Sequence, residues 1–205
     1  MLAALASGVL LGLSAGLAPG PLLALVLAQT LRHGPREGCK IALSPLVTDA
    51  PIILVALGVA AKLNELQPLL GVVSLAGGTF VLYLAWDSFR TVNPEAGASA
   101  DRPGSWFKGI LTNLLSPHPW LFWLTVGAAL LAKALRQSGL AAAAFLAGFY
   151  LLLVGSKVAV ALLAARWRNL LAGRTYRWVM RGLGAVLALF SLLLFREGLK
   201  HLGAI

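Results

Sequence analysis

The sequence predicts an all-α integral membrane protein with six transmembrane helices, five being the alternative count. Of its 205 residues, 59% are hydrophobic and 12% are charged, whereas soluble domains carry about 25% charged residues. A helix needs about 20 apolar residues to span a bilayer, and the chain contains a series of stretches of about that length. The predicted spans are residues 2–31, 41–61, 66–86, 107–132, 137–165 and 178–202.

Two of the predicted spans are interrupted by proline pairs. The first span contains Pro19-Gly20-Pro21, and the fourth contains Pro117-His118-Pro119. Proline removes a backbone donor and clashes with the preceding turn, so a regular helix cannot pass through either segment. In lipid, the freed backbone groups are tolerated where protein or a watery cavity satisfies them. Broken apolar segments in corresponding positions indicate the substrate site of a transporter.

The placement of the two breaks predicts an inverted 3+3 repeat with broken helices within one transmembrane domain, residues 1–205. The segment 91–105 is rich in Pro, Gly, Ala, Ser and charge, and reads as a linker between the halves 1–90 and 106–205. Each half holds three spans, and each break lies in the first span of its half. Since three is odd, the second half enters the membrane in the opposite orientation to the first.

One charged residue interrupts the second span of each half: Asp49 in the first and Lys157 in the second. A charge at bilayer depth costs at least about 2.5–3.5 kcal/mol on insertion scales, so it faces a cavity or a partner. We therefore expect the two side chains to lie close together or to face one cavity near the breaks. The functional reading is a proton-linked carboxylate and an anion-binding ammonium. A mutual salt bridge without a transport role is the alternative.

The second break also carries polar side chains. His118 could titrate near physiological pH, or it could be a satisfied polar residue that lines the break. Asn113 and Ser116 could hydrogen-bond the freed backbone groups or a ligand. With the prolines, these residues complete the predicted substrate-binding or coupling set, which is Pro19, Gly20, Pro21, Asp49, Asn113, Ser116, Pro117, His118, Pro119 and Lys157.

Small residues predict close helix packing rather than catalysis in the first span. Gly8, Gly12, Gly16 and Gly20 are four residues apart and form one helical ridge against which another helix can pack. Residues 12–16 also match the G-x-S-x-G pattern of hydrolases, but that motif needs a strand–turn–helix elbow and a base. We therefore predict no enzyme activity, no catalytic residue, no cofactor and no metal ligand.

The basic residues predict the orientation of the chain. The net charge is +10, but the basic side chains sit in short loops between spans, which argues against a nucleic-acid partner. Eleven of the 17 Lys and Arg residues follow the first, third and fifth spans, and five lie on the other side. Because cytoplasmic loops are enriched in Lys and Arg, both termini are expected to be periplasmic in a bacterial inner membrane.

These motifs resemble the lysine exporter family, which includes homoserine and threonine efflux proteins. The resemblance rests on residues 16–21, the basic loop 32–38, Asp49 and residues 111–117, and it covers essentially the whole chain. Pro19-Gly20-Pro21 matches the hallmark of the family's first span. In the fourth span the chain departs from the Asn-x-x-Asn-Pro-Lys-like pattern, with Ser116 and His118 in place of asparagine and lysine, and with an added Pro119.

The resemblance implies proton-driven efflux of amino acids or small relatives across the inner membrane. The expected partners are a small-molecule substrate, protons and membrane lipids, and a homodimer is one assembly to test. Two alternatives stay open from the sequence. One is an inorganic-ion exporter of the same broad superfamily, although one carboxylate makes a poor cage for a divalent cation. The other is a membrane scaffold without transport activity.

Overall fold

The computed structural model describes residues 1–59, 67–90, 104–168 and 173–203, and all regular structure in these ranges is helical. The predicted linker 91–105 lies mostly outside the described residues. The helices are α1 (Leu2–Leu17), α2 (Pro21–His33), α3 (Pro35–Ala42), α4 (Pro45–Val59), α5 (Gln67–Arg90), α6 (Ser105–Leu114), α7 (Pro117–Phe122), the π-helix η2 (Trp123–Gly127), α8 (Ala128–Gln137), α9 (Gly139–Arg168) and α10 (Gly173–His201).

The described helices confirm an all-α membrane protein with five or six spans. Five segments are long and apolar enough to cross a bilayer, and the bent pair α1–α2 makes a sixth if it is counted as one broken span. Many large apolar side chains are exposed, as lipid contact requires. The five are Pro35–Gly58, Gly71–Phe89, Pro117–Gln137, Gly139–Arg166 and Arg177–His201.

One boundary prediction was wrong. The basic segment before residue 41 was expected to be a loop, but most of it forms α3, so the second span begins at Pro35. Gly34 explains the sharp joint, because its φ of 97° lies in the left-handed region that glycine adopts without strain. Pro35 then starts the new helix at a position that needs no backbone donor.

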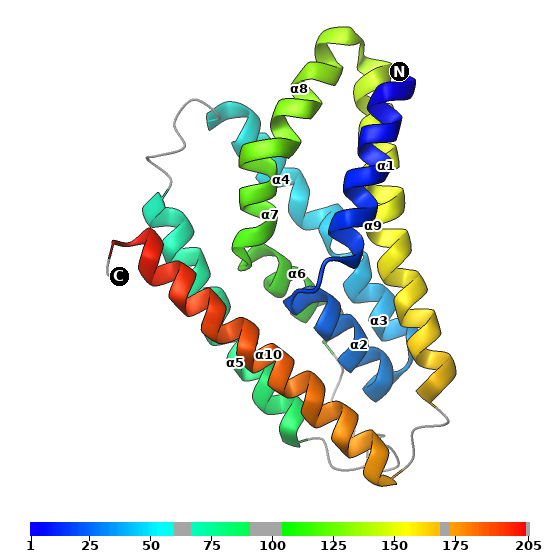
Figure 1. The fold of residues 1–205 in the computed structure, drawn as a ribbon, viewed down its shortest axis with the longest axis vertical. Coiled ribbons are helices and arrows are strands. Elements are labelled where there is room, and N and C mark those ends of the chain that lie inside the picture. The colour runs from blue at the N-terminus through cyan, green and yellow to red at the C-terminus, as the bar shows by residue number, and fades with distance from the viewer. Residues whose placement is uncertain (60–66, 91–103, 169–172, 204–205) are drawn as a thin grey trace.

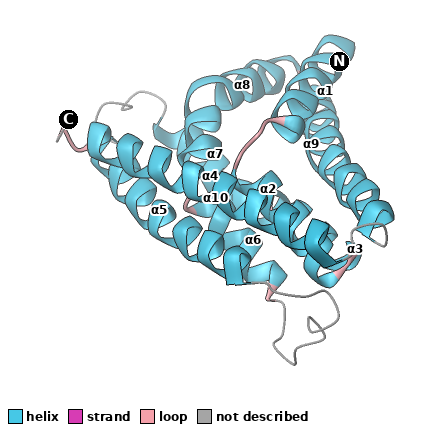
Figure 2. Cartoon of the chain, turned by 60° about the horizontal axis from the view of Figure 1, so that its bottom comes forward, coloured by secondary structure: helices cyan, strands magenta, loops and turns pink. Residues whose placement is uncertain are grey.

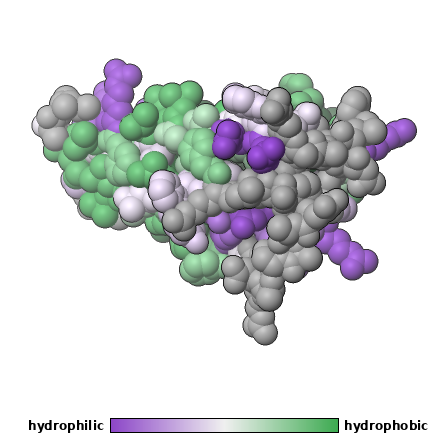
Figure 3. Space-filling view, turned by 90° about the horizontal axis from the view of Figure 1, so that it is seen from below, coloured by the Kyte–Doolittle hydropathy of each residue, from purple (hydrophilic) through white to green (hydrophobic). Residues whose placement is uncertain are grey.

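The helices divide into two flanks that meet at the broken segments. Figure 1 shows α1 beside α9 on one side and α5 beside α10 on the other, with α7 between them, and Figure 2 shows the same two pairs from another direction. The joint α2–α3, the end of α5 and the ends of α9 and α10 nearest residues 169–172 lie at one end of the molecule. We call this the basic end, and Figure 3 shows hydrophilic side chains on it.

The glycine ridge of α1 packs against α9 as predicted. A Cβ atom at Gly8 or Gly12 would collide with the backbone oxygen of Phe145 or Phe149. The α5–α10 pair is equally close, since Gly71 and Gly198 lie against each other's helix. These contacts let two helix backbones approach, as small residues do in membrane bundles.

We expect Gly12→Ala to destabilise the protein by about 1–3 kcal/mol, because the added methyl group overpacks the α1–α9 contact. The matched control is Gly155→Ala on α9, where a Cβ atom meets nothing within 4 Å. The control should be neutral or stabilised by up to about 1 kcal/mol through helix propensity. Thermal unfolding in detergent measures both, and equal effects of the two changes would contradict the packing described here.

The helix pairing has the pattern that an inverted repeat requires. The first span packs on α9 through α1, the fourth span packs on α4 through α6, α7, η2 and α8, and α5 packs on α10. Exchanging the two halves converts the first pairing into the second and leaves the third unchanged. The repeat itself, like the division into halves, stays a prediction.

Candidate functional site

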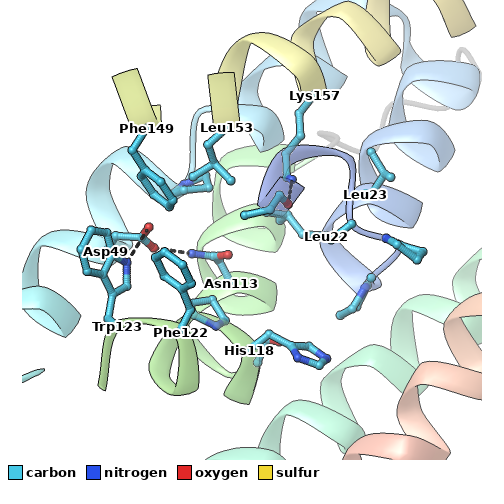
Figure 4. A pocket seen from close by; sticks show the side chains of 18 residues that line it. Leu22, Leu23, Asp49, Asn113, His118, Phe122, Trp123, Phe149, Leu153 and Lys157 are labelled. Carbon is cyan, nitrogen blue, oxygen red and sulfur yellow. Dashed lines mark hydrogen bonds between the residues drawn. The ribbon is translucent and has the colours of Figure 1, made fainter. Parts of the chain in front are cut away.

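A cavity of about 280 Å³ lies where the two broken helices meet. Its walls come from both breaks, from α4, from α7 with η2, and from α9 (Figure 4). Nine of the ten predicted site residues line it, and Pro117 does not. The nine are Pro19, Gly20, Pro21, Asp49, Asn113, Ser116, His118, Pro119 and Lys157.

The first break is a sharp, extended turn between two helices. α1 ends at Leu17, Gly20 is fully extended, and α2 begins at Pro21 after a bend of 62°. Pro21 occupies the first turn of α2, where its missing N–H costs nothing. Gly20 caps α2 without a side chain and borders open space. The break therefore presents bare backbone to the cavity.

Lys157 stabilises the end of α1. Its Nζ donates hydrogen bonds to the carbonyl oxygens of Gly16 at 2.7 Å and Ala15 at 3.1 Å. In an unbroken helix the Ala15 carbonyl would accept from residue 19, but Pro19 has no N–H to donate. A cation at a helix C-terminus also complements the helix dipole. The buried lysine thus satisfies the carbonyl groups that the proline break leaves free.

The second break is stabilised in a corresponding way. α6 ends at Leu114, Ser116 is extended, and Pro117 starts α7. The indole nitrogen of Trp120 donates to the Leu114 carbonyl oxygen at 2.9 Å. Both helix breaks therefore have carbonyl groups that accept hydrogen bonds from side chains.

Asp49 is almost fully buried and accepts three hydrogen bonds. Asn113 Nδ2 donates to Oδ1 at 3.0 Å, while Trp123 Nε1 and the Tyr150 hydroxyl donate to Oδ2 at 3.2 and 3.4 Å. Asn113 also donates to Thr48 Oγ1 at 2.6 Å. Buried polar groups need such partners, and these donors come from α6, η2 and α9. The carboxylate is therefore held at a fixed place where the two halves of the chain meet.

Aromatic rings form the wall beside Asp49. The Phe122 and Phe149 rings stack with centroids 5.1 Å apart, and the Trp123 ring meets Phe149 edge-on at 5.3 Å. Trp123 lies in the π-helical turn, and Gly127 leaves the space for its ring. Single π-turns are frequent at functional sites, and this one aims the indole N–H at the carboxylate.

Asp49 and Lys157 face the same cavity, as the sequence led us to expect. Among the described residues the two make no ion pair within 4.0 Å, so the alternative of a direct salt bridge is not what the structure has. Figure 4 shows them on different walls, each with its own hydrogen-bond partners. Their role in binding or coupling stays a prediction.

The predicted set of ten residues leaves out the aromatic residues of the site. The sequence favoured Trp123 as a membrane anchor or a packing residue, with lining of the path as the less favoured alternative, and Tyr150 and Phe149 were not singled out. One signal was present: Phe149, Leu153 and Lys157 are spaced four apart, which places them on one face of a helix. Because a charge within a membrane span faces a cavity or a partner, the face with Lys157 was the one to expect at the cavity.

The fold and the cavity define a multi-pass helical membrane protein with a buried polar site between two broken helices. The family model of LysE type translocators matches residues 13–198. The chain belongs to this family, and its general function is therefore efflux transport across a membrane. It follows that small-molecule substrates and membrane lipids are its partner classes.

One curated relative is the uncharacterized membrane protein YahN of Escherichia coli (strain K12). It is 26% identical over 197 residues, which cover 89% of this chain and 85% of the relative. No solved structure matches the chain significantly.

Proposed function

We propose that the protein is a secondary exporter of amino acids or small amino-acid-like metabolites across the bacterial inner membrane. One observation carries this proposal: a single cavity holds two buried, opposite charges that are not paired with each other. Charges at this depth are costly. A ligand with one positive and one negative group would bridge them, and an α-amino acid is the smallest common metabolite of that kind.

Hydrogen-bond capacity supports the bridging arrangement. The Asp49 carboxylate offers about four acceptor sites and uses three for protein donors. The Lys157 ammonium has three donors and uses two for backbone carbonyls. Each group keeps one place for a ligand, the carboxylate for a substrate ammonium and the ammonium for a substrate carboxylate.

The start of α2 adds favourable charge for a substrate carboxylate. The N–H groups of Leu22 and Leu23 lie in its first turn, where no intrahelical partner exists, and both residues line the cavity. The N-terminus of a helix carries partial positive charge, and broken helices of transporters use it for anionic substrate groups. The carboxylate is therefore expected between Lys157 and the start of α2.

The cavity is less suited to an inorganic cation. Asp49 is the acidic residue among those that line it, and most of its acceptor capacity is used by protein donors. Calcium takes six to eight oxygen ligands, and magnesium demands an octahedral set. In a membrane scaffold without transport activity, the two buried charges would be energetically costly and would serve no function.

The proposal includes proton coupling, with Asp49 and His118 as the titratable cavity residues that could carry the proton. A carboxylate that exchanges a substrate ammonium for a proton would link efflux to the proton gradient. A homodimer stays a prediction. The orientation is likewise proposed from the basic end, where Arg32 and Lys108 lie near the end of α2 and the start of α6. That end would face the cytoplasm.

Labelling of a single cysteine tests the orientation. In a Cys39→Ser background, a cysteine introduced as Gly97→Cys, in the linker outside the described residues, should react with a membrane-impermeant maleimide from the cytoplasmic side. In spheroplasts it should react after permeabilisation but not before. Labelling of intact spheroplasts would reverse the proposed orientation.

Counterflow in proteoliposomes tests the proposed function. Vesicles loaded with a mixture of unlabelled amino acids should take up labelled amino acid transiently without any ion gradient, because a carrier exchanges its substrate. Asp49→Asn should abolish this uptake in protein that remains monodisperse in detergent. Vesicles loaded with divalent metal salts form the second arm. Metal exchange without amino-acid exchange would overturn the proposal in favour of an ion exporter.

A further inference from the structure

We infer that the cavity selects α-amino acids with an uncharged, apolar side chain, an inference that rests on the proposed function. The walls of the cavity are mostly apolar. Leu22 and Leu23 of α2, Phe122 of α7, and Phe149 and Leu153 of α9 contribute apolar side chains to the lining. Specific sites combine such apolar walls with a few placed polar groups. Here the polar groups are those that a substrate's ammonium and carboxylate would use.

Once Asp49 and Lys157 hold the two ends of an amino acid, His118 is the remaining titratable side chain in the lining. A substrate with a lysine-like side chain would bring a second ammonium without a second carboxylate to meet it. An acidic side chain would lack a second lysine or arginine. An unpaired charge in a buried site costs several kcal/mol, so both classes are disfavoured.

The cavity volume of about 280 Å³ is at the lower limit of small-molecule sites, which are usually about 300–1,000 Å³. It has room for a single free amino acid and not for a peptide.

Competition in the counterflow assay tests this selectivity. Unlabelled valine, leucine and methionine should each inhibit uptake of labelled leucine at least tenfold more strongly than lysine or glutamate. A gain-of-function variant sharpens the test: Leu23→Glu places a carboxylate in the apolar wall and should raise inhibition by lysine. Leu23→Gln, which changes the same side chain without adding a charge, is the matched control.

The outcomes separate this inference from the proposed function. If no amino acid exchanges at all, the proposed function fails. If amino acids exchange but lysine competes as well as leucine in the wild type, the function holds and the selectivity inferred here is wrong. Increased lysine competition in Leu23→Glu, and not in Leu23→Gln, supports the cavity as the place where the side chain is selected.

A second inference rests on the ion pairs at the basic end. Asp87 of α5 pairs with Arg32 of α2 at 2.6 Å and lies 3.5 Å from Lys108 of α6. One carboxylate thus joins α5 to the two half-helices that lead to the breaks. The α5–α10 pair makes its main contacts with the rest of the bundle through α2, α6 and α7. The basic end is therefore closed by charge as well as by packing.

The opposite end carries a corresponding set of charges, and among the described residues these form no ion pair between helices. Glu197 lies about one turn before the end of α10, as Asp87 does in α5. It is exposed and contacts His201 on its own helix at 3.9 Å. Lys133 and Arg136 are exposed on α8, near the end of the fourth span. Arg32 occupies the corresponding place near the end of the first span. In the exchange of halves that an inverted repeat requires, Asp87 corresponds to Glu197, and Arg32 corresponds to Lys133 or Arg136.

We propose that Glu197 pairs with Lys133 or Arg136 when the basic end opens and the opposite end closes. Transporters built from inverted repeats alternate by rocking one unit against another around a fixed site. The α5–α10 pair is the unit that moves here. Its two helices pack closely against each other, whereas its contacts with the rest of the bundle are mainly with α2, α6 and α7. When the Asp87 ion pairs break and the Glu197 ion pair forms, the cavity opens to the basic end and closes to the opposite end.

Cross-linking of introduced cysteines by a short bifunctional thiol reagent, in a Cys39→Ser background, tests the exchange. Glu197→Cys with Arg136→Cys, or with Lys133→Cys, should cross-link under substrate exchange and much less in the resting protein. Adding Asp87→Asn to the Glu197 pairs should raise their cross-linking yield without substrate. If counterflow is active and neither Glu197 pair cross-links under any condition, the proposed closure is wrong.

Discussion

Replacing Lys157 with methionine is expected to lower the stability and to abolish transport. The ammonium satisfies one buried and one partly buried carbonyl oxygen at the end of α1, and an unsatisfied buried group costs about 1–3 kcal/mol. Methionine keeps an unbranched side chain of similar length but donates no hydrogen bond. The thermal midpoint in detergent and the rate of counterflow measure the two effects.

Lys200→Met is the matched control, because Lys200 is exposed near the end of α10 and does not line the cavity. It should change neither quantity. If Lys157→Met unfolds at the wild-type temperature, the carbonyl groups at the break do not depend on the lysine.

The same variant in combination with Asp49→Asn tests how the two buried charges are coupled. Each charge has its own set of protein partners, but opposite charges that face one cavity also attract each other. We therefore expect the double variant to lose slightly less stability than the sum of the two single losses. A double variant more stable than either single would show that the residues pair directly in the folded protein.

The double change Pro19→Ala with Pro21→Ala is expected to leave the protein in the membrane and reduce efflux to the background of empty vesicles. An alanine at residue 19 supplies the N–H that the Ala15 carbonyl lacks, so α1 and α2 can join into one helix. The bend of 62° and the bare backbone at Gly20 would both be lost. Membrane abundance and counterflow are the two measurements.

Pro68→Ala is the control, since Pro68 is exposed in the first turn of α5. It removes a proline without removing a break. Wild-type transport from a well-expressed Pro19 and Pro21 double variant would exclude the first break from the transport mechanism.

The spans, the breaks and the buried charges were predictable because each has a local sequence signal. Apolar length identifies a span, proline marks a break, and a lone charge such as Asp49 or Lys157 stands out in an apolar helix. The helix α3 was missed because its charges resemble those of a loop. Its position depends on the left-handed Gly34 and on packing against α2, α6 and α9.

The partners of the buried charges were beyond sequence reasoning. Lys157 binds backbone carbonyls of α1, and a carbonyl has no sequence signal of its own. Trp123 reaches Asp49 because a π-helical turn changes its direction, while Tyr150 approaches from a helix about a hundred positions later in the chain. Local periodicity assigns a face to each side chain, but tertiary packing decides which faces meet.

The central claim is that Asp49 and Lys157 hold the two charged ends of one substrate. Competition by leucine, leucine amide and N-acetyl-leucine in the counterflow assay tests it most directly, because the amide lacks the carboxylate and the acetyl compound lacks the ammonium. Leucine should inhibit uptake of labelled leucine, and the two derivatives should be at least tenfold weaker, which corresponds to about 1.4 kcal/mol. Inhibition by either derivative equal to that of leucine would contradict the account.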